Sequence, residues 1–218
     1  MEDSSFRSGG EIARGAGVLP AHSSSSLTMA TTSSKATFLQ RLEQSRLLDN
    51  EQLARAAELV ADADAPQSIA RSLVREGLLS EWQAAQLLQG RTQFHLGKYK
   101  LIRVLGTGGM GTVYLAEHVT MNRRVAVKSV SSRLSRNPDA LKQFLDEART
   151  IAALDHPNIV HAYSVDEVDG RYFLVMEYVA GKDLATIVEE QGPFSFVAAV
   201  DLVCQAADGL AYAHEKGV

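Results

Sequence analysis

The chain has 218 residues, of which 45% are hydrophobic and 22% charged, and its formal net charge is -4. A chain of this size can fill one domain core and a small second module, but not two full domains. The acidic balance argues against a nucleic-acid-binding surface, which usually carries a clustered excess of Lys and Arg. One cysteine, Cys204, excludes an intrachain disulfide, and we expect it to be a small buried hydrophobe in a reducing compartment.

The sequence predicts neither a metal site nor a membrane segment. Its six histidines lack the paired spacing of metal ligands. No apolar run approaches the ~20 residues that cross a bilayer, and the acidic N-terminus does not resemble a secretory signal. We therefore expect a cytoplasmic location, while an intact gene could still encode a membrane segment further on.

Residues 1–36 form a leader rich in Ser, Thr, Gly and Ala, with four consecutive serines at 23–26. Such a composition buries too little apolar surface to offset the entropy lost on ordering. We expect this leader to be disordered.

Residues 37–92 predict a small module of three or four helices, because apolar residues such as Phe38 and Leu42 recur at helical spacing. Another helix is expected over 66–75, and Trp82 is expected in the module's core.

One pattern occurs twice in this module. The stretches 45–53 and 76–84 each contain a Leu-Leu pair, a polar capping residue and an acidic first turn. We expect Asp49 and Ser80 to be helix N-caps. The sequence leaves open whether the module is a packing accessory or a regulatory or partner-docking unit, because charge patterning does not distinguish the two.

From Tyr99 onward the period of the apolar residues changes to two, which is typical of antiparallel strands. We expect five strands, over 99–105, 112–117, 124–130, 159–165 and 172–179. The last two are expected to form a hairpin closed near 168–171.

Three helices are expected in the same part of the chain, over 138–154, 183–190 and 196–214. The first is long and amphipathic, with an apolar stripe that includes Phe144, Ala148 and Ile151. Ser195 is the expected cap of the last helix.

Residues 105–114 read Leu-Gly-Thr-Gly-Gly-Met-Gly-Thr-Val-Tyr, a glycine-rich turn. Glycines at 106, 108 and 111 allow positive φ and a close approach of backbone N–H groups to phosphate oxygens. Shortly afterwards, Val125-Ala126-Val127 leads to Lys128, whose ammonium can contact phosphates. The two features together predict a nucleotide triphosphate site.

Other interpretations of the turn fit less well. In the dinucleotide-binding fold the glycines open a helix, whereas residues 112–116 alternate like a strand. A Walker A loop needs Gly-Lys-Ser/Thr, which Gly111-Thr112-Val113 does not supply. A purely structural hairpin is the third alternative.

Lys128 ends an apolar strand, where an unpaired charge is costly. Glu147 lies angularly between Phe144, Ala148 and Ile151, so we expect it to face the core and to pair with Lys128. The alternative is a solvated glutamate that pairs with Arg149 or with nothing.

Five motifs stand in order: the glycine-rich turn, Val-Ala-Val-Lys, the helix glutamate, His-Pro-Asn-Ile-Val at 156–160 and Val-Met-Glu-Tyr-Val at 175–179. In this order they resemble the N-terminal lobe of a eukaryotic-type serine/threonine protein kinase, and of bacterial, especially planctomycete, kinases in particular. The resemblance covers about 96–218. It implies an α+β fold: a kinase-like N-lobe with a five-stranded antiparallel sheet and one long helix, then the first helices of the C-lobe.

The resemblance also implies roles for individual residues around ATP. The turn would cover the phosphates, Lys128 would contact the α- and β-phosphates, and Glu147 would orient Lys128. The turn consists of Gly106, Thr107, Gly108, Gly109, Met110 and Gly111. Leu105, Val113 and Ala126 would enclose adenine.

Further residues would complete this site. Met176 would be the gatekeeper behind adenine, and backbone groups of Glu177 and Val179 would bond the adenine edge. Asp183 matches the family's ribose-contacting acid, although an N-cap role is equally compatible with its position.

No catalytic residue is expected within the sequence, because in the family the base and the magnesium ligands would lie beyond Val218. We therefore expect the ATP-binding part of a serine/threonine kinase, inactive alone, with ATP as ligand, magnesium in an intact relative and a protein as substrate. The alternative is a non-catalytic nucleotide-binding or scaffold fragment that acts through its N-terminal helices. The expected divisions are 1–36, 37–92 and 97–218.

Overall fold

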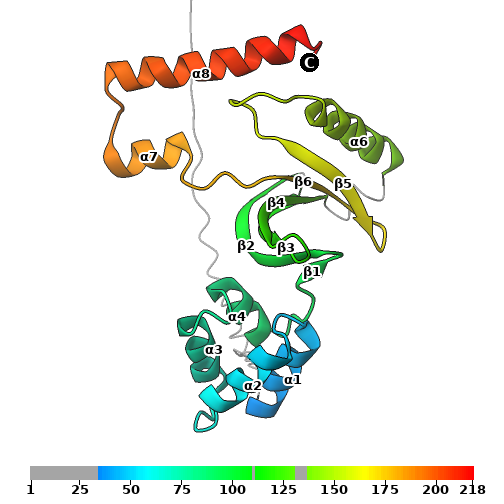
Figure 1. Cartoon of the computed structure of the whole chain (residues 1–218), viewed down its shortest axis with the longest axis vertical. Coiled ribbons are helices and arrows are strands. Elements are labelled where there is room, and N and C mark those ends of the chain that lie inside the picture. Colours follow the sequence, from blue (N-terminus) through cyan, green and yellow to red (C-terminus); the bar gives the residue numbers. More distant parts are fainter. Residues whose placement is uncertain (1–33, 110, 131–136) are drawn as a thin grey trace, which may run out of the picture. The chain divides into compact units, whose positions relative to one another are not determined.

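The structure is a computed structural model that describes residues 34–109, 111–130 and 137–218. Nearly all of the leader, and Met110 of the glycine-rich turn, lie outside these residues, so the expectations for them stay untested. Among the described residues, four helices precede a sheet whose fourth and fifth strands are separated by a long helix, and two more helices follow (Figure 1).

The first four helices confirm the expected helical segment. They are α1 (Lys35–Ser45), α2 (Asn50–Leu59), α3 (Pro66–Arg75) and α4 (Glu81–Leu88). Asp49 and Ser80 cap α2 and α4 as expected, and each forms a reciprocal capping box with the glutamine three residues later. Both caps satisfy backbone N–H groups that the first turn of a helix leaves without partners.

These helices enclose an apolar core of their own. Its largest fully buried members, each at most 1% exposed, are Phe38, Leu42, Ile69, Leu73 and Leu87 of the helices and Phe94 of the segment after α4. Burying one such side chain stabilises a fold by about 1.5–3 kcal/mol relative to exposure. Phe38 and Leu42, whose spacing predicted the helical module, are thus both part of its buried core.

The sheet is antiparallel throughout and has the strand order β1-β2-β3-β4-β6-β5. Its strands are β1 (His95–Leu96), β2 (Tyr99–Gly108), β3 (Gly111–His118), β4 (Arg123–Val130), β5 (Ala162–Val168) and β6 (Arg171–Glu177). The expected number of five strands is wrong by one, because the two residues of β1 pair with the start of β2. A strand of two residues is too short to show an alternating pattern in the sequence.

The β5–β6 hairpin closes where the sequence predicted. Val168 pairs with Arg171, and the intervening Asp169 and Gly170 have φ values of 51° and 73°. Two successive residues with positive φ are typical of the tight hairpin turn that Asp-Gly favours. The turn thereby fixes the register of β6 against β5.

Alternation along the strands divides the sheet into two faces. We call the first the Trp82 face; its core consists of Tyr99, Leu101, Ala116, Val125, Val127, Phe173 and Val175, and Trp82 of α4 packs against it. The second is the α6 face, where Ala162 and Leu174 pack against Ala148 of α6 (Pro138–Ala152). Because side chains alternate along a strand, neighbours of a residue on one face belong to the other.

Trp82 lies at the junction of helices and sheet. It packs against the apolar core of the helical module, as expected, but it is only half-buried there and packs against the Trp82 face of the sheet as well. Its ring is 5.8 Å from that of Phe94 and 5.8 Å from that of Tyr114, measured between centroids. Beside it, Gln83 is only 5% exposed, and its Nε2 donates a 2.7 Å hydrogen bond to the carbonyl of Leu101.

A strand irregularity explains why this carbonyl is accessible. The pairing of β2 with β3 shifts between Leu101 and Arg103. At such a bulge the ladder is locally interrupted. The Ser80 hydroxyl donates to the neighbouring carbonyl of Ile102, so α4 binds β2 at its bulge.

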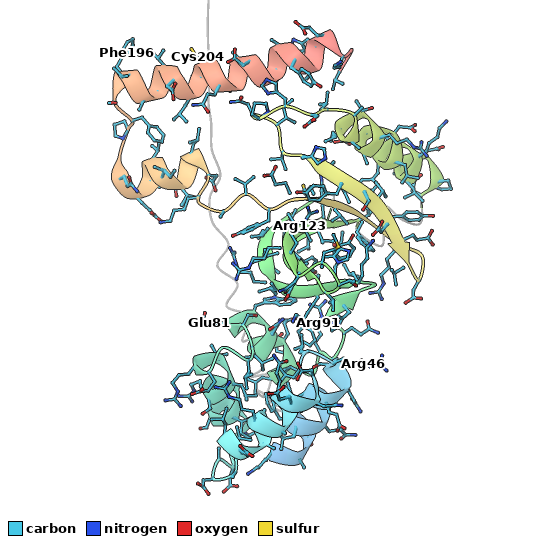
Figure 2. The ribbon with its side chains drawn as sticks, in the orientation of Figure 1. Arg46, Glu81, Arg91, Arg123, Phe196 and Cys204 are labelled. Atoms are coloured by element: carbon cyan, nitrogen blue, oxygen red, sulfur yellow. The ribbon has the colours of Figure 1, made fainter. Side chains whose placement is uncertain are left out.

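The last two helices are α7 (Leu184–Gln191) and α8 (Phe196–Glu215), and Ser195 caps α8 as expected. Little of α8 is buried: only Gly209 and Ala213 are, whereas Phe196 is 83% exposed. Cys204 is exposed as well, so the expectation of a buried thiol is wrong (Figure 2). The sequence shows an apolar helix but not which surface, if any, covers it.

By length and composition, α8 is also long and apolar enough to cross a membrane. The expectation that no segment reaches this length is therefore wrong. Its Asp201 and Asp208 are exposed, and a carboxylate near the centre of a membrane helix costs about 2.5–3.5 kcal/mol on insertion scales.

The bond between Gln83 and β2 predicts a measurable contribution to stability. Gln83→Ala removes the donor to Leu101 inside a buried site, which typically costs about 1–3 kcal/mol. We expect the free energy of unfolding to fall by that amount in urea titrations followed by circular dichroism and by the fluorescence of the one tryptophan, Trp82.

Gln40→Ala is the matched control, because Gln40 is exposed on α1. It should change the free energy of unfolding by no more than about 0.5 kcal/mol. Equal effects of the two substitutions would show that the bond to Leu101 contributes nothing.

Candidate functional site

The glycine-rich turn connects two strands. It joins β2 to β3, with Gly106 opposite Val113 and Gly108 opposite Gly111. The segment after the turn is therefore a strand, as its alternation predicted, and not the helix that follows the glycines of a dinucleotide-binding fold.

Of the two reasons expected for glycine in this turn, positive φ applies to one of the three positions. Of the expected positions, Gly111 has positive φ, 148°, but Gly106 and Gly108 do not. A Cβ added to Gly106, Gly108 or Gly109 would meet no atom of the described chain within 4 Å. Neither strain nor crowding inside the protein requires glycine at these three positions, which leaves bare backbone beside open space that a ligand can enter.

The strand register aligns the turn with Lys128. Gly106 pairs with Val113, Val113 with Lys128, and Lys128 with Leu174. Residues directly opposite in antiparallel strands share a face, and Leu174 belongs to the α6 face. Lys128, Val113 and the start of the turn therefore lie together on the α6 face, where Lys128 is half-buried.

A second row on the same face brings two more of the candidate residues together. Ala126 pairs with Met176, which pairs in turn with Ala162. Ala126 is buried and Met176 half-buried. Leu105 lies at a second shift in the β2–β3 register, between Val104 and Gly106, and is also half-buried.

Glu147 does not face the core. It is exposed and lines a surface hollow with polar residues of its own helix, among them Gln143 and Thr150. Adjacent helical residues differ by about 100° in direction, so Glu147 lies one step away from Ala148, the buried residue of α6. The expectation of a core-facing glutamate is thus wrong. Arg149 pairs with Asp146 at 2.8 Å and not with Glu147.

The segment after β6 carries the remaining candidates. The N–H of Glu177 donates to the carbonyl of His161 at 2.8 Å, so this N–H is engaged within the sheet. Val179 is 62% exposed on the connection to α7.

Asp183 is the N-cap of α7. Its carboxylate accepts hydrogen bonds from the N–H of Thr186, at 2.8 Å, and from the Thr186 hydroxyl, at 3.0 Å. The backbone bond from Thr186, followed by the hydroxyl bond, lowers the pKa of Asp183 below its ordinary value. One of the two roles expected for Asp183 is therefore present in the structure.

Comparison with known proteins gives a match along the whole segment that holds these residues. The family model described as "Protein kinase domain" matches residues 99–218. The chain belongs to the protein kinase family. The sequence resemblance to that family is thereby confirmed, and the kinase fold with it.

Curated relatives are bacterial and are named serine/threonine-protein kinases. PrkC of Bacillus subtilis is 37% identical over 122 residues, which cover 56% of this chain and 19% of PrkC. Pkn1 of Myxococcus xanthus is 35% identical over 161 residues, covering 72% of this chain and 23% of Pkn1. PknE of Mycobacterium bovis is 40% identical over 126 residues, covering 58% of this chain and 22% of PknE. The chain thus spans about a fifth of the length of these relatives.

A solved structure agrees with this family. A double mutant of the PknI kinase domain from Mycobacterium tuberculosis superposes with a TM-score of 0.50 at 28% identity, covering 57% of this chain and 50% of that domain. The similarity therefore extends over about half of a solved kinase domain.

The lowered pKa of Asp183 predicts a pH dependence of the α7 cap. An aspartate whose pKa is lower in the folded state stabilises the fold at pH values above its pKa in the unfolded chain, about 3.9. That stabilisation is lost as the pH falls through the pKa of the folded state. We expect the Thr186 amide and the Asp183 carboxyl carbon to titrate together below the ordinary value of 3.8 in NMR spectra.

Asp183→Asn serves as the control, because asparagine also caps helices but does not titrate. In this variant the Thr186 amide should no longer shift over the same pH range. Titration of Asp183 at or above 3.8 would contradict the cap as the cause.

Proposed function

We propose that the α6 face of the sheet binds ATP and that the intact protein transfers its γ-phosphoryl group to serine or threonine residues of other proteins. The observation that carries this proposal is the register that aligns Gly106, Val113 and Lys128 across three strands. Bare backbone, an apolar side chain and a cation then follow one another on one face. This set of groups suits a ligand that carries both an apolar ring and phosphates.

The turn and Lys128 would act on the phosphates. Exposed backbone N–H groups and an ammonium neutralise negative charge, which is the main contribution of a protein to phosphoryl transfer. Leu105, Val113 and Ala126 would enclose the adenine, with Met176 behind it. The carbonyl of Glu177 and the backbone of Val179 would bond its edge, since the Glu177 N–H already donates to His161.

Two acidic residues have less direct roles in this proposal. Glu147 would orient Lys128 only if α6 turned its exposed flank toward β4, because Glu147 faces away from the core here. Asp183 would contact the ribose in addition to capping α7.

Protein kinases in general use magnesium with ATP. In the three described ranges, no group of three or more His, Cys, Asp or Glu side chains could hold a metal ion. We therefore assign no magnesium ligand to these residues and derive no step through the metal.

We also propose that the chain divides into a leader (1–36), a helical module (37–92) and a kinase segment (97–218). The separate apolar core of α1–α4 supports the module as a unit. We further propose that the chain works in the cytoplasm, because the carboxylates of Asp201 and Asp208 make α8 a poor membrane helix. A scaffold role through α1–α4 is the second candidate, favoured by the attachment of α4 to β2.

Removal of the Lys128 charge tests the site. Lys128→Met keeps the length of the side chain but removes the ammonium, so we expect the affinity for ATP to fall by roughly tenfold or more. Isothermal titration calorimetry with the 218-residue chain measures it. Lys142→Met, at an exposed position on α6, should bind ATP like the parent. Equal affinities of all three proteins would place the phosphates elsewhere.

Gly108→Ala separates binding from folding. Its Cβ would meet no described atom within 4 Å, so stability should be unchanged or higher by up to about 1 kcal/mol. The same methyl group would occupy the open side of the turn and weaken ATP binding. Thermal unfolding and calorimetry give both quantities, and an Ala variant that binds ATP as well as the parent would refute contact between the turn and the phosphates.

A further inference from the structure

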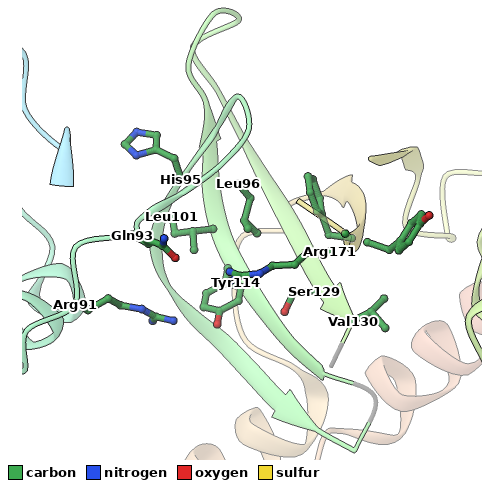
Figure 3. A pocket seen from close by; sticks show the side chains of 12 residues that line it. Arg91, Gln93, His95, Leu96, Leu101, Tyr114, Ser129, Val130 and Arg171 are labelled. Carbon is green, nitrogen blue, oxygen red and sulfur yellow. The ribbon is translucent and has the colours of Figure 1, made fainter. Parts of the chain in front are cut away.

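The Trp82 face of the sheet, opposite the proposed nucleotide site, carries a cavity of about 550 Å³ (Figure 3). It is lined by the segment after α4, by β2, β3 and β4, and by the start of β6. Cavities that hold small molecules typically measure about 300–1,000 Å³. Leu96 and Tyr114, which are half-buried and pack against the apolar core of this face, supply the apolar part of its wall. Its size and apolar wall therefore suit the body of a small organic molecule.

The charged residues at this cavity are all of one sign. Arg91 and Arg171 line it, and none of its lining residues is Asp or Glu. Figure 3 shows the two arginine side chains extending toward Tyr114 from opposite sides. Two guanidinium groups directed at one space favour an anion there, and their planar donors match phosphate and carboxylate oxygens.

Neither arginine is neutralised by a carboxylate of the described residues. Nη1 of Arg91 donates to Oε1 of Gln86 at 3.1 Å, and its guanidinium lies 5.6 Å from the centroid of the Trp82 ring. The Arg171 side chain makes no ion pair or hydrogen bond with any residue that the structure describes. Both arginines are exposed to solvent, and no carboxylate of the described residues competes with an anion for them.

His95, another lining residue, is half-buried and has two further cations near it. Burial lowers its pKa, and the charges of Lys100 and Arg46 lower it further. A depressed histidine pKa means that the protonated, positive form is disfavoured at this place. Burial is the main cause of this shift, and the charges of Lys100, which pairs with Glu117 at 3.2 Å, and of Arg46 add to it.

The fold fixes the position of Arg171 from two sides. The Asp169-Gly170 turn sets the first residue of β6, and Phe173 two residues later is buried on the Trp82 face. Because side chains two apart on a strand share a face, Arg171 is directed to the cavity by the same register that buries Phe173.

We propose that this cavity is a second ligand site, separate from the nucleotide site, for a small organic anion with an apolar ring and a phosphate or carboxylate head. The head lies between Arg91 and Arg171, and the ring lies against Leu96 and Tyr114. Because Arg91 follows α4 and contacts Trp82, such a ligand also joins the helical module to the sheet. Ligand binding to the folded state stabilises that junction.

The test uses phenyl phosphate as the probe and the 218-residue chain. In ¹H–¹⁵N NMR titrations we expect saturable shifts of the amides of Ser129, Gly170 and Arg171. Inorganic phosphate, which lacks the ring, and phenol, which lacks the charge, should bind more weakly. Benzoate in a parallel titration shows whether the site prefers a carboxylate or a phosphate head.

Arg171→Gln should weaken phenyl phosphate binding about tenfold, the usual effect of losing one charged hydrogen bond. Thermal unfolding of this variant without ligand should match the parent, because the side chain has no partner among the described residues to lose. Arg124→Gln is the matched control: Arg124 is an exposed strand arginine on β4 that does not line the cavity, and its removal should leave the affinity unchanged.

The remaining outcomes would overturn the proposal. They are the absence of saturable shifts, shifts confined to the glycine-rich turn, and an Arg171→Gln variant that is folded and binds phenyl phosphate like the parent. Shifts confined to the turn would report binding at the nucleotide site alone, so this test is independent of the proposed ATP function.

Discussion

The alternation of side chains across the antiparallel sheet is the constraint on which the rest of this structure depends. Val125 and Val127 are buried on the Trp82 face, so Ala126 and Lys128 between and after them must point to the opposite face. A slip of one residue would move the ammonium of Lys128 to the apolar core of the Trp82 face, at a cost of several kcal/mol. Packing of the two valines on one side of β4 therefore fixes the direction of Ala126 and Lys128 on the other side.

Strand β2 links the helical module to the glycine-rich turn. Near its start, Ser80 and Gln83 of α4 hold the carbonyls of Ile102 and Leu101 at a bulge, and its last residues form the turn. Backbone groups that a bulge frees must find partners elsewhere. Here the partners are side chains at the N-terminus of α4. The same strand therefore attaches the helical module and positions the turn.

Two expectations failed because a helix presents several directions and the sequence does not say which one is covered. Glu147 follows the apolar spacing of α6 closely enough to suggest a core position, yet one step of about 100° from Ala148 leaves it in solvent. Cys204 lies in an apolar stretch of α8 but is exposed. Both positions depend on what packs against the helix, which is a property of distant segments.

The sequence alone predicted features that depend on local residues. These are the Asp-Gly hairpin, the strand that follows the glycine-rich turn, the order of motifs that identifies a protein kinase, and the helix caps Asp49, Ser80, Asp183 and Ser195. These features depend on residues within a few positions of one another. Tertiary structure decided the two-residue strand β1, the contact of Trp82 with Tyr114 of β3, the bond of Gln83 to β2, and the meeting of Arg91 with Arg171 at one cavity. Such contacts join residues that lie far apart in the chain, and no local pattern records which distant groups will share a surface.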